Sequence, residues 1–269
     1  IVVEYKDIMA TIADLLDIFR KVSRDVDGDG INDIVGLNSI HTGWFSESYT
    51  VGFGASWIKD GKVTADSPEM RDAWNFWSNA VAQGYVEPTL SAMWEEGRSA
   101  IRFTDNSWVT QWSNPETGVK FRWGTAPLPT AAGVEKQGRS GAGLFSIAKQ
   151  TKHPDEAWEL LKYLTGPEAS AVRAEKEGWF PGHAGAIPAY ATWLRELANV
   201  GGNPPDPYMP IMEAVRLGKP QSYMTTGHFL DIDGIVAPRL DAMLTAGEAV
   251  GTTLSNIQRE VEAFLEKTQ

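Results

Sequence analysis

Amphipathic helical patterns alternate with short apolar segments along nearly the whole chain, and this alternation restricts the fold more than any other feature. The strongest pattern covers residues 5–22, where apolar side chains recur at helical spacing on one face. Ser67 followed by Pro68 predicts the start of another helix, which the pattern continues to Gln83. We expect further helices over residues 155–164, 167–177, 189–198, 208–217, 228–245 and 250–266.

Short strands are predicted between the helices, over residues 100–103, 121–126 and 144–148, because Gly, Pro or polar turn residues bound each segment. Helices that alternate with short strands predict the α/β class, as an α/β sandwich. The Pro-rich segment at 201–210 is expected to be a linker or a crossing segment. Every apolar segment is shorter than the roughly 20 residues that a membrane-spanning helix needs.

The charge and the cysteine content of the chain exclude several classes of function. A formal net charge of -11 disfavours nucleic acid and anionic membrane surfaces as partners, because both bind clusters of Lys and Arg. A neutral ligand fits this charge better. The absence of cysteine excludes disulfides, thiolate metal sites and Cys nucleophiles, and it is compatible with an oxidising or a reducing compartment.

Tryptophan is unusually abundant, with 11 residues in a chain of 269. An indole ring offers a broad apolar face that matches the C–H face of a pyranose, and one N–H donor at its edge. Large aromatic side chains also fill hydrophobic cores, and we expect most of these tryptophans to do so. Trp74, Trp77 and Trp158 lie inside helical patterns, which predicts that they are core residues.

An acidic, glycine-rich segment follows the first predicted helix. It resembles an EF-hand calcium loop, with acids at positions 1, 3, 5 and 9 and a backbone carbonyl at position 7. Position 12 is glycine instead of the bidentate glutamate, so a calcium sensor is not expected. A weak structural calcium site and a metal-free polar turn both remain open. The expected ligands of a calcium ion are Asp25, Asp27, Asp29, Ile31 and Asp33.

Several motifs occur in order between residues 95 and 182. They are EEGRSAIRFTDNSW at 95–108, GTAPLP at 124–129, GAGLFSIAK at 141–149, HPDEAWELLKYLTGPEA at 153–169 and EGWFPG at 177–182. Their order and spacing resemble the extracellular solute-binding proteins, family 1, which are maltose-binding-protein-like sugar and oligosaccharide receptors of ABC importers. The first motif departs from the family pattern at Arg98, where lysine is usual, and at Asn106 and Ser107, where glycine is common.

The resemblance implies a periplasmic-binding-protein-like fold of type II, helix-rich with short strands and divided into two lobes. Residues 1–140 and 200–269 would form the carboxy-terminal lobe, which is the more complete one. Residues 141–199 would contain the hinge crossing and helices of the amino-terminal lobe. Family members usually carry more than about 100 residues before the helix at 5–22. An unusually short member and an incompletely recorded sequence would both explain the missing part of that lobe.

The resemblance also implies a ligand site made of aromatic and polar groups. Trp108 matches a family tryptophan that often stacks on the sugar, and Trp179 lies in EGWFPG, which resembles a family loop that lines the cleft. Small residues at 141–143 would let a ligand approach the backbone, although a β-bulge or a tight strand crossing explains them equally well. The expected ligand-binding residues are Trp44, Asp105, Asn106, Trp108, Ala142, Gly143 and Trp179.

The implied function is the capture of a sugar, oligosaccharide or polyol and its delivery to the permease subunits of an ABC importer. Closure of the two lobes about a hinge would trap the ligand. Such a receptor is expected to be a monomer in the periplasm or at the cell surface, without catalytic activity and without a required cofactor. Its signal peptide would lie outside this sequence.

A glycoside hydrolase is the alternative, because acidic, Trp-rich proteins that hold sugars are often enzymes. Hydrolysis needs two facing carboxyl groups about 5 to 9.5 Å apart, one of them with a raised pKa. The sequence contains no zinc motif, P-loop, GxSxG elbow or dinucleotide-binding motif that would indicate other chemistry. Candidate acids for a hydrolase are Glu47, Glu95, Glu96, Asp105, Asp231 and Asp233, although no spacing marks a pair among them.

Overall fold

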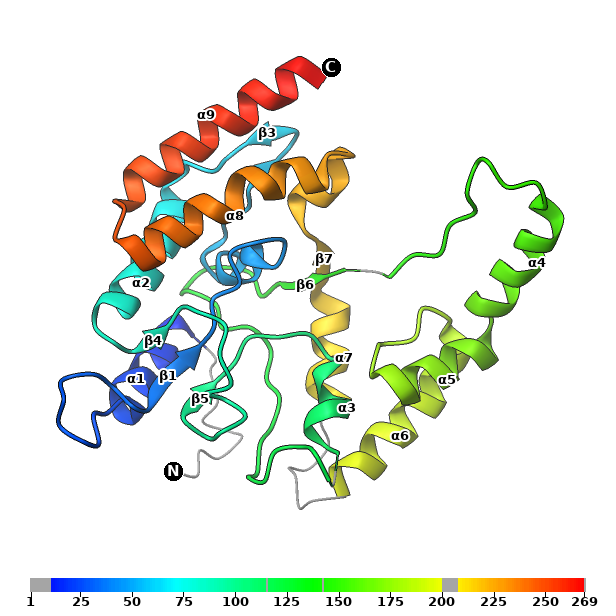
Figure 1. Cartoon of the computed structure of the whole chain (residues 1–269), viewed down its shortest axis with the longest axis horizontal. Coiled ribbons are helices and arrows are strands. Elements are labelled where there is room, and N and C mark those ends of the chain that lie inside the picture. Colours follow the sequence, from blue (N-terminus) through cyan, green and yellow to red (C-terminus); the bar gives the residue numbers. More distant parts are fainter. Residues whose placement is uncertain (1–10, 115, 142, 200–207, 269) are drawn as a thin grey trace. The chain divides into compact units, whose positions relative to one another are not determined.

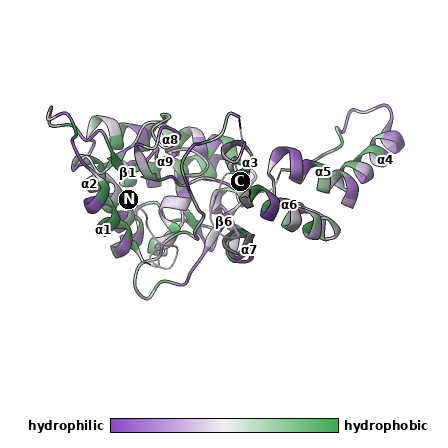
Figure 2. Ribbon diagram, turned by 90° about the horizontal axis from the view of Figure 1, so that it is seen from below, coloured by the Kyte–Doolittle hydropathy of each residue, from purple (hydrophilic) through white to green (hydrophobic). Residues whose placement is uncertain are grey.

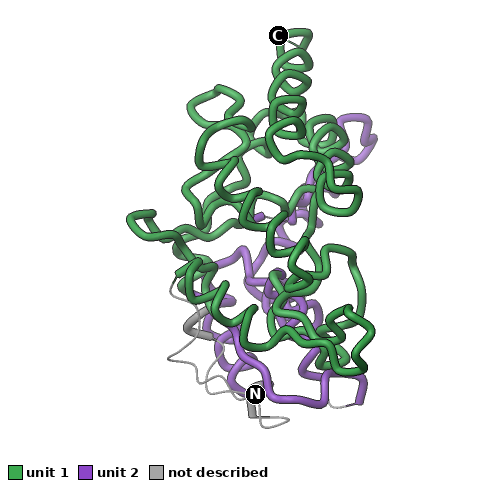
Figure 3. Tube along the Cα trace, turned by 90° about the vertical axis from the view of Figure 1, so that its left-hand side faces the viewer, with its two compact units in different colours: residues 1–103, 126–140, 213–269 green, residues 104–125, 141–212 purple. Residues whose placement is uncertain are grey.

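The computed structural model describes residues 11–114, 116–141, 143–199 and 208–268, which form two compact units (Figure 1 and Figure 3). Unit 1 comprises the described parts of 1–103, 126–140 and 213–269, and unit 2 comprises those of 104–125 and 141–212. The predicted α/β class is confirmed, since the chain is rich in helices and its strands are short. Among the described residues, no helix is both long and apolar enough to cross a bilayer.

Unit 1 contains a three-stranded parallel sheet with β1 (Val35–Asn38) between β4 (Val86–Glu87) and β5 (Ser99–Ile101). All four residues of β1 are buried, as expected for the central strand of a parallel sheet. Two further strand pairs are parallel β6–β7 and the antiparallel hairpin β2–β3. The remaining elements of unit 1 are α1 (Ile12–Val22), η2 (Ser46–Tyr49), η3 (Val51–Phe53), β2 (Ile58–Lys59), β3 (Lys62–Val63), α2 (Pro68–Ala82), β6 (Gly138–Ser140), β7 (Gly218–Pro220), η5 (Ser222–Thr226), α8 (Phe229–Ala246) and α9 (Val250–Thr268).

Local capping chemistry fixes where the first two long helices of unit 1 begin. The hydroxyl of Thr11 accepts a hydrogen bond from the Asp14 N–H at 3.1 Å, and the Asp14 carboxylate accepts one from the Thr11 N–H at 2.9 Å. This reciprocal capping box satisfies two backbone donors that a helix leaves unpaired. Ser67 caps the Met70 N–H of α2, and Pro68 occupies the first turn, so the predicted start of this helix is confirmed.

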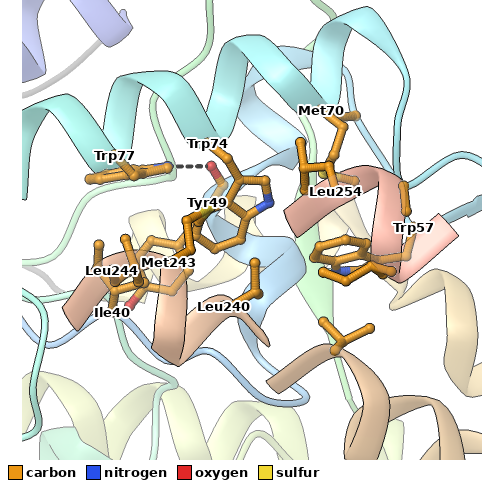
Figure 4. Packing of buried hydrophobic residues seen from close by; sticks show 14 of the residues in the cluster. Ile40, Tyr49, Trp57, Met70, Trp74, Trp77, Leu240, Met243, Leu244 and Leu254 are labelled. Carbon is orange, nitrogen blue, oxygen red and sulfur yellow. Dashed lines mark hydrogen bonds between the residues drawn. The ribbon is translucent and has the colours of Figure 1, made fainter. Parts of the chain in front are cut away.

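Large aromatic side chains fill the core of unit 1 (Figure 4). Tyr49, Trp57, Trp74 and Trp77 are each at most 2% exposed, and they pack with aliphatic side chains of α8 and α9. The sequence prediction that Trp74 and Trp77 are core residues is therefore confirmed. Helices α8 and α9 lie side by side and contact α2, which carries both of these tryptophans.

Unit 2 is helical, and no strand occurs among its described residues. Its α5 contacts α3, α4 and α6. Gly178 ends α5 with a φ of 74°, in the left-handed region that favours glycine, as the sequence predicts for the end of this helix. The helices of unit 2 are α3 (Trp108–Trp112), α4 (Pro154–Thr165), α5 (Pro167–Glu177), η4 (Ala184–Ala186), α6 (Ile187–Asn199) and the first part of α7 (Tyr208–Leu217).

Two predicted strands and one predicted core residue are wrong. Residues 121–126 and 144–148 form no strand, because no described segment pairs with their backbone N–H and C=O groups in a sheet. Trp158 is 52% exposed, since α4 buries none of its side chains in the described structure. Figure 2 shows that α4 nevertheless carries hydrophobic as well as hydrophilic residues.

Other boundaries differ from the sequence prediction or fall outside the described residues. The helix predicted over 5–22 is described from Ile12, and most of the predicted linker at 201–210 lies outside the described residues. Residues 104–125 belong to unit 2, whereas the lobe predicted over 1–140 includes them. The assignment of the two units to the lobes of a receptor stays a prediction.

Replacement of a core tryptophan should destabilise unit 1 far more than replacement of the exposed one. Trp74→Ala is expected to lower the free energy of unfolding by roughly 3–5 kcal/mol, because a fully buried indole leaves a large cavity. Trp158→Ala is the matched control and should change it by less than about 0.5 kcal/mol. Urea unfolding followed by circular dichroism measures both, and equal effects would contradict the assigned burial.

Candidate ligand-binding site

The segment between Ser39 and Tyr49 accepts hydrogen bonds from several buried aromatic side chains. The Tyr49 hydroxyl donates to the carbonyl of Ser39 at 2.9 Å. The indole N–H of Trp57 donates to Ser46 Oγ at 3.1 Å, and that of Trp77 donates to the carbonyl of Tyr49 at 2.7 Å. A buried indole or phenol needs such an acceptor, because an unpaired donor in the interior is costly. The core therefore fixes the course of this segment.

Trp44 lies in the middle of this fixed segment and faces solvent in part. Its side chain is 37% exposed, in contrast to the buried tryptophans around it. Its ring centre lies 5.7 Å from that of His41 and 5.5 Å from that of Phe45, both in edge-to-face geometry. An exposed indole held by neighbouring rings is a preorganised surface for an apolar sugar face.

Two carboxylates of α8 adjoin the turn that carries Trp44. The hydroxyl of the fully buried Tyr223 lies 3.2 Å from Asp233 Oδ1 and 3.3 Å from the carbonyl of Gly43, so it links the turn to α8. Thr42 Oγ1 donates to Asp241 Oδ1 at 2.6 Å. A Cβ atom at Gly43 would lie 3.4 Å from Oδ2 of Asp233, so the turn closely approaches this carboxylate.

The electrostatics of this group are those of a partly desolvated acidic site. Partial burial raises the pKa of Asp233, and the Tyr223 hydroxyl and His41 oppose this shift. Partial burial lowers the pKa of His41, while the charges of Asp233 and Asp241 act in the opposite direction. Neutral His41 and two carboxylates offer hydrogen-bond acceptors for hydroxyl groups beside an aromatic face.

Unit 2 brings four of the predicted site residues together. The side-chain amide of Asn106 donates to the carbonyl of Gly178 at 2.9 Å, which fixes the loop that carries Trp179. A Cβ atom at Gly178 would lie 2.7 Å from the carbonyl oxygen of Ser107, so glycine permits this close approach. Asp105 accepts hydrogen bonds from the N–H and the hydroxyl of Ser107 at the start of α3.

The predicted aromatic residues of unit 2 differ in exposure. Trp179 is 43% exposed, whereas Trp108 is half-buried and lies 5.5 Å from the ring of Trp112. Gly143 is exposed, and a Cβ atom there would meet no atom within 4 Å. Ala142 lies outside the described residues. Trp44 belongs to unit 1, so the predicted site residues fall into one group on each unit.

The sequence does not indicate four polar groups of the candidate site on unit 1 as ligand contacts. They are His41, Tyr223, Asp233 and Asp241, of which Asp233 is predicted only as a candidate acid for hydrolysis. The spacing of His41 and Trp44 in HTGW is a weak local signal. The contacts from α8 and η5 bridge distant parts of the chain, so no short motif indicates them.

Most acids that a hydrolase could use are held by other groups. Glu47 is fully buried and paired with Arg139, Glu95 is paired with Arg102, and Glu96 is paired with Arg98. Asp105 accepts from Ser107 within its own turn. These four acids therefore take part in ion pairs or turn hydrogen bonds, which leaves Asp231 and Asp233 of α8 as the other candidate acids.

The acidic loop after α1 is stabilised by its own backbone. Asp25 accepts the N–H groups of Gly28 at 2.6 Å and Gly30 at 2.8 Å, and these bonds lower the pKa of its carboxyl group. Asp33 accepts the N–H of Val26 at 2.8 Å. One carboxylate oxygen from each of Asp25, Asp27 and Asp29 lies within 4.8 Å of the others. Loop position 12 is Gly36 of β1, where any side chain would collide with Phe19.

A family model described as bacterial extracellular solute-binding protein matches residues 1–171. The match covers more than half of the chain. The chain belongs to this family. The resemblance that the motifs at 95–182 carry is thereby confirmed.

Solved structures of bacterial solute-binding proteins share the fold. UgpB from Mycobacterium tuberculosis, in complex with glycerophosphocholine, is 22% identical with a TM-score of 0.70, and the match covers 90% of this chain and 60% of UgpB. MalE from Bdellovibrio bacteriovorus, bound to maltotriose, is 18% identical with a TM-score of 0.71, with 99% and 68% covered. Lmo0181 from Listeria monocytogenes, in complex with cycloalternan, is 15% identical with a TM-score of 0.76, with 98% and 66% covered. This solute-binding protein therefore spans about two thirds or less of the length of these three proteins.

The charges around His41 predict its titration. Asp233→Asn should lower the pKa of His41 further, because it removes a negative charge that stabilises the imidazolium. Asp241→Asn should lower this pKa too, but by less. NMR titration of the imidazole C–H signals, with His41→Gln for assignment, measures both shifts. A rise in the pKa of His41 in Asp233→Asn would contradict the arrangement.

The same shift predicts how His41 contributes to stability. The folded pKa of His41 lies below its ordinary value of 6.5, so folding favours the neutral imidazole. The stabilisation by neutral His41 is fully present above the pKa of the unfolded state. It is lost as the pH falls from that pKa to the lower pKa of the folded state. His41→Gln should therefore flatten the pH dependence of the unfolding free energy on the acidic side of 6.5, as measured by urea unfolding at several pH values.

Proposed function

We propose that this solute-binding protein captures a neutral sugar, oligosaccharide or polyol for an ABC importer. The observation that carries the proposal is the partly exposed Trp44, held by the core and flanked by His41, Asp233 and Asp241. Family membership supports a role in binding, outside the cell or in the periplasm. The bound compounds of the similar structures, maltotriose and cycloalternan, are of the proposed ligand class.

The chemistry of the site is stacking combined with hydrogen bonds. The indole of Trp44 would cover the apolar face of a sugar ring, while the carboxylates of Asp233 and Asp241 accept hydrogen bonds from its hydroxyls. The acidic groups disfavour a strongly anionic ligand, in agreement with the net charge of -11. On unit 2, the candidate ligand contacts are the rings of Trp108 and Trp179 and the side-chain oxygen atoms of Asp105 and Asn106.

The protein delivers the bound ligand for transport and does not convert it chemically. Ligand capture shifts the population from an open towards a closed form, and the permease subunits accept the closed form. No catalytic step is included, because the candidate acids outside α8 are engaged in ion pairs or turns. The protein acts as a monomer that presents one ligand at a time.

Isothermal titration calorimetry with maltotriose, cycloalternan and glycerophosphocholine tests the binding role. At least one of the two sugars should bind saturably, and Trp44→Ala should weaken that binding by roughly 1–3 kcal/mol because a stacked ring is lost. Trp158→Ala removes an exposed indole outside the site and is the matched control. Wild-type affinity in Trp44→Ala would exclude Trp44 from the site, and release of hydrolysis products would overturn the assignment as a receptor.

A structural calcium ion at the loop 25–33 is a second, separate part of the proposal. The converging oxygens of Asp25, Asp27 and Asp29 are the hard donors that Ca²⁺ prefers. Calcium should raise the unfolding temperature of the wild-type protein relative to a chelator, because it binds only the folded loop. Asp27→Asn keeps the size of the side chain but removes charge, and it should reduce this increase. An unfolding temperature that calcium does not change would show that the loop is a metal-free polar turn.

A further inference from the structure

Three residues after Trp44, the carboxylate of Glu47 forms an ion pair in the interior of unit 1. Nη2 of Arg139 lies 2.9 Å from Oε1 of Glu47, and the two side chains are 5% and 0% exposed. The second carboxylate oxygen accepts the backbone N–H of Ser222 at 2.6 Å. Arg139 also donates to Ser56 Oγ at 2.9 Å. Both oxygens of Glu47 are thus bound, each by a different segment of the chain.

The ion pair joins elements that are distant in the sequence. Glu47 belongs to η2, Arg139 to the middle of β6, and Ser222 to the start of η5, two residues after the end of β7. Strands β6 and β7 pair in parallel, with Arg139 opposite Lys219. Along the chain, β6 is followed directly by unit 2, and β7 follows α7, which begins in unit 2. The pair therefore attaches the turn with Trp44 to β6, and the second carboxylate oxygen attaches it to the start of η5, which follows β7.

The turn with Trp44 is held at a second point by the same stretch of chain. Tyr223, the residue after Ser222, donates its hydroxyl to the carbonyl of Gly43. Gly43 and Glu47 lie on either side of Trp44, and both are bound to residues 222–223. Besides the ring contacts of Trp44 with His41 and Phe45, contacts from residues 222–223 therefore hold the chain on both sides of the indole.

We propose that Glu47 and Arg139 are a positioning pair, which sets the orientation of Trp44 relative to β6 and β7. This role matters for ligand binding only under the proposed function, in which Trp44 contacts the ligand. A buried ion pair is often no more stabilising than apolar residues of similar volume, so stability alone does not account for it. A carboxylate bound through both oxygens and a planar guanidinium instead supply directional contacts, which orient the segments they join.

A double variant separates positioning from stability. Glu47→Gln with Arg139→Met removes both charges, so that neither is left buried without its partner. Labelling with 5-fluorotryptophan gives a ¹⁹F NMR signal for Trp44, assigned by Trp44→Phe. We expect this signal to shift in the double variant while the urea midpoint stays close to that of the wild type. Arg139→Lys keeps the charge but loses the planar fork, and it should shift the signal by less.

The ion pair between Arg239 and Glu260 provides the matched control. It joins α8 and α9 within unit 1, and its side chains are 32% and 34% exposed. Glu260→Gln should leave the Trp44 signal unchanged, because this pair has no contact with the turn. An unchanged Trp44 signal in the folded double variant would overturn the positioning role. If the double variant does not fold, Arg139→Lys decides instead, and an unchanged Trp44 signal in that variant would overturn the positioning role.

Calorimetry of the same variants with maltotriose and glycerophosphocholine tests the positioning role of Glu47 and Arg139 separately from the proposed ligand-binding function. Loss of positioning should weaken binding by about tenfold, while Glu260→Gln binds like the wild type. If neither compound binds the wild type, the ligand assignment fails, but the Trp44 signal still decides the positioning role. Wild-type affinity together with a shifted signal would show that the ligand does not use Trp44, which contradicts the proposed function alone.

Discussion

Hydrogen bonds from buried aromatic side chains to the segment 39–49 are the interaction on which the candidate site of unit 1 depends. Packing indole and phenol rings stabilises the core through their apolar area, but each also brings one N–H or O–H group out of water. Tyr49, Trp57, Trp77 and Tyr223 all donate to the segment 39–49. The same buried aromatic side chains therefore stabilise the core and fix the backbone of the candidate site.

This arrangement explains how the irregular turn at 41–45, which precedes η2, is held in place without a regular strand. Glu47 and Gly43 are bound to residues 222–223, and Asp233 reaches the turn through Tyr223. A ligand that stacks on Trp44 would meet a surface that is already oriented, so less conformational entropy is lost on binding. The same logic holds in unit 2, where Asn106 fixes the loop that carries Trp179.

The features predictable from the sequence are those that local chemistry determines. Helix starts at Ser67-Pro68 and the end at Gly178 depend on capping and on φ, and they were predicted correctly. Burial of Trp158 and pairing of residues 144–148 depend on what lies opposite them, which no local pattern encodes, and both predictions were wrong. The prediction of Trp44 depends on its aromatic type and its place after the acidic loop, whereas its acidic neighbours on α8 come from a distant part of the chain, which no local pattern indicates.

The signals of the individual tryptophans during ligand binding show which of these rings meet the ligand. In a ¹⁵N-indole-labelled protein titrated with maltotriose, the signal of Trp44 should shift saturably. The signals of Trp74 and Trp77 should stay in place, since these rings are enclosed in the core. Saturable binding without a shift of the Trp44 signal would contradict the assignment of the binding surface, and so would a shift confined to the core tryptophans.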